Sequence, residues 1–90
     1  MHRFVIERNF PGAGKLDQAQ LREIATKSCD VLKRMGTAIQ WVRSYVTDDK
    51  IDCVYLAENP EQLRRHAAAG NFPSDSIARV RTIIDPTTAG

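Results

Sequence analysis

The central part of the chain, residues 39–58, alternates between two sets of side chains in the manner of a β-hairpin. It reads IQWVRSYV, then TDDK, then IDCVYLAE. Period-two alternation with β-branched and aromatic residues predicts two antiparallel strands. We expect a three-residue turn at Asp48-Asp49-Lys50, which would set Tyr45 opposite Cys53 and Arg43 opposite Tyr55. One face of this hairpin is aliphatic, and the other is expected to meet a ligand, a nucleic acid or a second copy of the chain.

Four further segments complete the pattern of the chain. They are a strand at 3–10, a helix at 17–35, a helix at 60–70 and a strand at 78–84. Asp17 and Asn59 are the expected N-caps of the helices, and Gly36 and Gly70 end them. The order βαββαβ predicts an α+β, ferredoxin-like domain over residues 1–86, with a four-stranded antiparallel sheet and both helices on one face. The first and third strands would be central, and residues 87–90 a disordered tail.

Strand parity divides the predicted sheet into two faces. The inner face is expected to hold Phe4, Ile6, Val42, Val46, Val54, Leu56, Val80 and Ile84. The outer face is expected to hold Val5, Glu7, Trp41, Arg43, Tyr45, Cys53, Tyr55, Arg79, Arg81 and Ile83. Trp41, Tyr45 and Tyr55 on the outer face would either anchor an interface between two sheets or stack on a planar ligand. Arg43, Cys53 and Arg81 accompany them as candidate ligand-binding or interface residues.

Two residues are candidates for metal binding or for acid–base chemistry. Glu7 is either a metal ligand or general base, or the ion-pair partner of Arg79 or Arg81, which would keep its charge and make it a poor base. His66 flanks the buried stripe of the second helix and is either packed there or a ligand. No second His or Cys stands at ligand spacing to it.

The charge and composition of the chain argue against several classes of function. A net charge of +2 over 90 residues gives no electrostatic reason to expect a nucleic-acid partner. The third strand also lacks the Gly-aromatic signature of RNA-binding βαββαβ modules. No apolar run reaches the roughly 18 residues of a membrane span, and we find no basic-then-apolar run of the kind that would predict a secretory leader. We therefore expect a cytoplasmic protein with no membrane partner and with Cys29 and Cys53 as free thiols.

One glycine-rich string invites a phosphate-binding interpretation. The string GAGK at residues 12–15 lacks the earlier glycine of a phosphate-binding loop. Leu16 also stands where Ser or Thr would bind Mg²⁺. We interpret the string as a flexible connection.

An ordered set of short motifs spans most of the chain, from Arg3 to Pro86. The set comprises Glu7-Arg8-x-Phe10-Pro11, Trp41-x-x-Ser44-Tyr45-Val46, Cys53-x-Tyr55-x-Ala57, Arg65-His66-Ala67 and Gly70-x-x-Pro73-x-x-x-Ile77. In this set the chain resembles the small bacterial domains of unknown function typified by a nickel-binding protein. The resemblance implies a ferredoxin-like subunit, a homodimer whose sheets pack face to face as a dimeric α+β barrel, and Ni²⁺ binding by a member of the family.

The function expected from these arguments is that of a non-enzymatic, homodimeric binding protein for nickel, another divalent metal ion or a small molecule. Glu7 and His66 match the family pattern as metal ligands, but parity places them on opposite faces of one sheet. A shared site would need strand ends, a loop or the second subunit. The alternative is a cofactor-free oxygenase or isomerase of the dimeric α+β barrel type, which is an analogy of fold alone.

Overall fold

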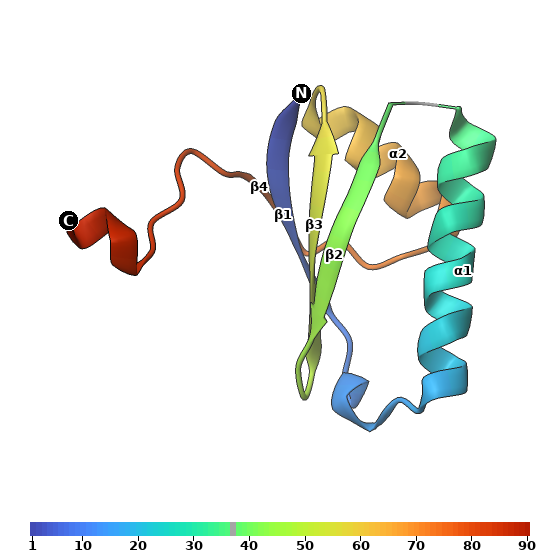
Figure 1. Ribbon diagram of the computed structural model, residues 1–90. Coiled ribbons are helices and arrows are strands. Elements are labelled where there is room, and N and C mark those ends of the chain that lie inside the picture. The colour runs from blue at the N-terminus through green and yellow to red at the C-terminus, as the bar shows by residue number, and fades with distance from the viewer. Residues whose placement is uncertain (37) are drawn as a thin grey trace.

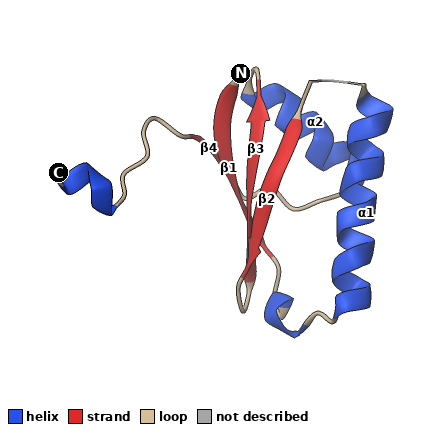
Figure 2. Ribbon diagram, viewed as in Figure 1, coloured by secondary structure: helices blue, strands red, loops and turns tan. Residues whose placement is uncertain are grey.

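One sheet, covered by helices on one side only, forms the body of the protein (Figure 1). This computed structural model describes residues 1–36 and 38–90. The elements run in the order β1(His2–Asn9), η1(Ala13–Lys15), α1(Gln18–Met35), β2(Gln40–Val46), β3(Lys50–Ala57), α2(Pro60–Gly70), β4(Ser76–Arg79) and η2(Pro86–Ala89). The strand order β2-β3-β1-β4 places β1 and β3 at the centre, as predicted. The α+β ferredoxin-like fold is thereby confirmed, with α1 and α2 on the same side of the sheet (Figure 2).

The helices begin and end where their capping residues predict. The Asp17 carboxylate accepts a hydrogen bond from the Gln20 amide at 2.8 Å, and the Gln20 side chain accepts one from the Asp17 amide at 3.0 Å. This reciprocal pair satisfies two of the free N–H groups at the start of α1. Gly36 ends α1 with φ of 61°, a left-handed conformation that glycine adopts without strain. Asn59 caps α2.

The predicted face of β3 is wrong. Phe4 pairs with Tyr55 and Ile6 with Cys53 across the β1–β3 ladder. Directly paired residues point to the same side of a sheet, so Cys53 and Tyr55 lie under the helices, with 4% and 2% of their surface exposed. Val54 takes the outer face instead, as does Leu56.

The hairpin turn and a bulge explain the error. The Thr47 amide bonds the Lys50 carbonyl at 2.9 Å, so only Asp48 and Asp49 form the turn, and a one-residue change of register exchanges the faces of a strand. A register shift between Trp41 and Arg43 then interrupts the alternation of β2. Trp41 therefore pairs with Tyr55 on the inner side, whereas Arg43 and Tyr45 stay on the outer side.

The last strand is shorter than predicted. Pairing between β1 and β4 ends at the partners Phe4 and Arg79, and one further hydrogen bond joins the Val80 amide to the Arg3 carbonyl. Beyond it the chain leaves the body (Figure 1), so Arg81, Ile83 and Ile84 lie outside the sheet and are exposed. The tail that was expected to be disordered contains η2, which Asp85 caps.

Candidate functional site

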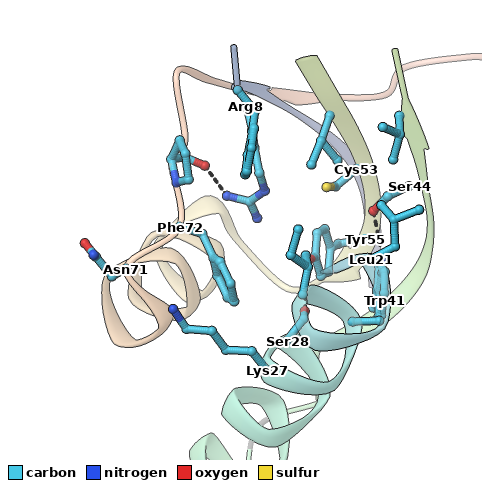
Figure 3. Close-up of a pocket in the computed structure, with 16 residues that line it drawn as sticks. Arg8, Leu21, Lys27, Ser28, Trp41, Ser44, Cys53, Tyr55, Asn71 and Phe72 are labelled. Carbon is cyan, nitrogen blue, oxygen red and sulfur yellow. Dashed lines mark hydrogen bonds between the residues drawn. The ribbon is translucent and has the colours of Figure 1, made fainter. Parts of the chain in front are cut away.

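A cavity of about 430 Å³ separates α1 from the sheet. Its floor comes from β2 and β3, its opposite wall from α1, and its rim from β1 and the segment 71–73 after α2 (Figure 3). The lining residues are Arg8, Phe10, Leu21, Ile24, Ala25, Lys27, Ser28, Trp41, Ser44, Val46, Ile51, Cys53, Tyr55, Asn71, Phe72 and Pro73. Most of these side chains are apolar, with a small number of polar groups among them, as in sites for small molecules.

Arg8 is the most unusual member of this lining. It is 5% exposed and points from β1 into the cavity (Figure 3). Its Nη1 donates to the Pro73 carbonyl, while its Nη2 has no hydrogen-bond partner among the described residues. The guanidinium also lies 5.5 Å from the centre of the Phe72 ring, a cation–π contact. A buried guanidinium with free donors is a strong site for an acceptor.

His66 lies behind the cavity wall, with none of its surface exposed. Its ring is 5.4 Å from that of Tyr55 and 5.3 Å from that of Phe72. Nε2 lies 3.4 Å from the Ser28 hydroxyl, whereas Nδ1 has no partner among the described residues. Burial lowers the pKa of His66, and the positive charge of Arg8 lowers it further, so the neutral imidazole is favoured.

The Ser28 hydroxyl connects His66 to the cavity. It lies 3.5 Å from the Tyr55 hydroxyl, and both Ser28 and Tyr55 line the cavity. Burial raises the pKa of Tyr55, so its phenol stays protonated and can donate a hydrogen bond to a ligand. The row His66–Ser28–Tyr55 gives the cavity a polar region next to its apolar walls.

Glu7 occupies the opposite side of the sheet. Its register partners are Asp52 on β3 and Ser76 on β4, and its carboxylate binds the Lys50 ammonium at 2.8 Å. The hydrogen bond that Lys50 donates to Glu7, together with the negative charge of Glu7, raises the pKa of Lys50. Glu7 therefore forms an ion pair with Lys50, and the prediction that its partner would be Arg79 or Arg81 is wrong.

One chain does not bring the two candidate metal ligands together. Glu7 lies on the outer face and His66 lies under the helices, on opposite sides of the sheet. Within residues 1–36 and 38–90, no group of three His, Cys, Asp or Glu side chains is placed to hold a metal ion. Nickel needs several such donors, so the described residues of a single chain do not fit it.

The other candidates divide between the two faces. Trp41, Cys53 and Tyr55 line the cavity, whereas Arg43 and Tyr45 lie on the outer face and Arg81 lies beyond the last strand. Both cysteines are free thiols. Sequence reasoning missed Arg8, Lys27 and Phe72 as site residues; for Arg8 the period-two spacing Phe4, Ile6, Arg8 was the available signal.

The buried imidazole predicts acid sensitivity. The unfolded chain binds a proton at His66 near pH 6.5, whereas the folded protein binds it only at lower pH. The free energy of unfolding should therefore fall as pH decreases through about 6.5, by up to about 1.4 kcal/mol per pH unit. Urea unfolding between pH 7.5 and 5 should show a smaller decrease in His66→Gln. His2→Gln is the control and should keep the wild-type slope; the same slope in both variants would contradict this role of His66.

Comparison with known proteins agrees with this fold. A family model described as "Nickel responsive protein SCO4226-like" matches residues 4–80. The crystal structure of SCO4226 from Streptomyces coelicolor A3(2) superposes with a TM-score of 0.76 at 15% identity, covering 91% of this chain and 99% of that one. No curated protein matches the chain, and none of the described helices is long and apolar enough to cross a membrane. Because the family model covers most of the sequence, the chain belongs to the SCO4226-like family of nickel-responsive proteins.

Proposed function

We propose that this protein is a cytoplasmic, homodimeric, non-enzymatic binding protein that holds a small, largely apolar molecule between α1 and the sheet. The cavity of about 430 Å³ is the observation that carries the proposal. Its volume lies in the range of small-molecule sites, and its few polar groups come from separate elements that converge on one space. The space lies between α1 and the sheet and is lined mostly by apolar side chains, so a bound apolar molecule would remove that surface from water.

The outer face of the sheet supports the homodimer. It carries Val5, Val54 and Tyr45, the last of which is 54% exposed, and none of the described helices covers it (Figure 2). The charges among them have both signs, with Glu7 and Asp52 beside Lys50. A two-fold pairing of two such faces would bury the apolar residues and set charges of opposite sign against one another. Trp41 and Tyr55 face the cavity, so Tyr45 takes over the role of interface anchor.

A divalent metal is the second candidate ligand, and the family's description as nickel-responsive favours it. Because the donors of one chain are separated by the sheet, a nickel site would need residues from two chains. The outer face is where they could meet, since Glu7 and Asp52 pair across β1 and β3 there. This arrangement links nickel binding to the dimer.

A cofactor-free oxygenase or isomerase remains the alternative function. The row His66–Ser28–Tyr55 is the observation that favours it, since it joins an imidazole of lowered pKa to a cavity wall. An enzyme would convert the bound molecule and lose that activity on removal of the Tyr55 hydroxyl. A binding protein would release the molecule unchanged.

The cavity should bind a neutral apolar probe. We expect N-phenyl-1-naphthylamine to gain fluorescence on addition of the protein, because transfer to an apolar site removes the dye from water. Ala25→Trp should abolish the gain by filling the space from α1, where Ala25 lines the wall. Thr26→Trp places the same indole group on the exposed side of α1 and should leave the gain intact. Equal dye binding in the two variants would place the dye elsewhere and refute the cavity as the site.

The dimer should depend on Tyr45. Tyr45→Ala should weaken self-association by about 2 kcal/mol or more if the side chain is an anchor. Sedimentation velocity at micromolar concentration measures this shift toward the monomer. Thr26→Ala, on the solvent side of α1, is the control and should sediment as wild type. A wild-type monomer under these conditions would end the dimer proposal.

Nickel affinity should respond to Glu7 and not to His66. Glu7 is half-exposed on the face assigned to the dimer, whereas His66 has no exposed surface and lies between two aromatic rings. Calorimetric titration with NiCl₂ should therefore show weaker binding in Glu7→Gln and unchanged binding in His66→Gln. Thermal melts of the same samples report whether each variant is folded. The opposite pattern would move the metal into the helix-covered side of the sheet.

A further inference from the structure

We propose that the cavity selects a planar aromatic carboxylate, whose carboxylate group binds the Arg8 guanidinium. This inference rests on the small-molecule binding proposed above and names the chemical class of the ligand. Three features carry it: an incompletely bonded buried cation, a lining without acidic residues, and walls of aromatic and aliphatic side chains.

The first feature is the bonding of Arg8. A guanidinium that is 5% exposed loses most of its hydration and needs partners for its five N–H donors. Pro73 supplies one carbonyl, and Nη2 has none within the described chain. The ion pairs of the described residues join other groups, namely the N-terminus with Glu58, Lys50 with Glu7 and Arg64 with Glu61. A ligand carboxylate would give Arg8 both an acceptor and a counter-charge.

The second feature is the sign of the charge in the cavity. The charged side chains in its lining are Arg8 and Lys27, and neither Asp nor Glu is among the lining residues that the structure describes. Lys27 Nζ lies 5.1 Å from the centre of the Phe72 ring, so both cations approach the same aromatic ring (Figure 3). Two cations without a lining acid favour an anionic ligand over a neutral or cationic one.

The third feature is the shape and polarity of the walls. Phe10, Trp41 and Phe72 contribute aromatic surface, and α1 contributes Leu21 and Ile24. These walls suit a flat hydrocarbon ring, which can pack edge-to-face or offset on aromatic neighbours. A phosphate would need more donors than one partly bonded guanidinium and a rim lysine supply. A single carboxylate on an apolar ring fits the few donors and the many apolar contacts.

The remaining polar groups suit a second, weaker contact with the ligand. The Tyr55 hydroxyl and Ser28 line the same cavity, and Trp41 Nε1 donates to the Ser44 hydroxyl at 2.9 Å, which leaves that indole satisfied. A hydroxyl or keto substituent on the ring could accept from Tyr55. The carboxylate alone defines the class.

The test compares an acid with its neutral isostere. Calorimetry with 2-naphthoate and 2-naphthamide on the wild-type protein should give at least about tenfold tighter binding of the acid, the effect of one charge-assisted hydrogen-bonded pair. Arg8→Met keeps the apolar stem and should remove this preference, leaving the affinity for the amide within about twofold. Arg22→Met, on the exposed side of α1, is the matched control and should keep the preference.

Each outcome decides the proposal. Equal affinity for acid and amide in the wild-type protein would overturn the role of Arg8 and leave small-molecule binding standing. Binding of neither probe, with the neutral dye also unbound, would overturn both proposals. Tighter binding of octanoate than of 2-naphthoate would overturn the aromatic assignment. If Arg8→Met does not fold, two measurements still decide the question. One is the comparison of acid and amide on the wild-type protein. The other is the preference for the acid in Lys27→Met, which should fall by less than the roughly tenfold expected from loss of Arg8.

Discussion

The register of β3 against its neighbours decides which side chains enclose the cavity. A turn of only Asp48 and Asp49 and a bulge after Trp41 bring Trp41, Cys53 and Tyr55 to the helix side of the sheet. The turn sets the parity of β2 relative to β3, and the ladder with β1 places Tyr55 under the helices, where its hydroxyl lies 3.5 Å from that of Ser28. Backbone pairing thus fixes the chemistry of a site in the middle of the sheet.

The polar residues on the helix side oppose stability and favour binding. Phe4 and Ile6 precede Arg8 on the same face of β1, and both are fully packed. Arg8 lies on the same face of β1 and places a positive charge under the helices. Burial of the imidazole and, next to it, the positive charge of Arg8 lower the pKa of His66. Two basic groups thus share one region without an acidic partner among the described residues. Such an arrangement is costly in a small domain, and a bound anion would remove much of that cost.

Much of the fold could be predicted from local signals, because each signal acts over a few residues. Asp17 with Gln20, Asn59 with Pro60, and Gly36 specify the helix boundaries through hydrogen bonds and backbone conformation. The element order then leaves few topologies for the sheet. The faces of β3 could not be derived in the same way, since parity depends on the length of the turn. TDDK permits turns of different length, and only packing against β1 selects between them.

The candidate site was harder to predict because its residues are distant in sequence. Arg8 contacts Phe72 and Pro73 from the other end of the chain, and no spacing within the sequence relates them. His66 was recognised, but its neighbours Ser28 and Phe72 became apparent only in the folded structure. The face assigned to Tyr55 and Trp41 was wrong, since both line the cavity on the helix side of the sheet. The presence of an aromatic residue in a strand does not by itself indicate on which face of the sheet its side chain lies.

The two faces of the sheet share the same backbone, and this links the two proposed binding events. On β1, Glu7 and Arg8 are adjacent and point to opposite sides, so the outer face and the cavity are separated by one peptide unit. On β3, the adjacent residues Val54 and Tyr55 likewise point to opposite sides of the sheet. If a partner sheet packed on Val54 changed the affinity of the cavity for its ligand, occupation of the cavity would change the affinity of the dimer by the same factor, whichever event comes first.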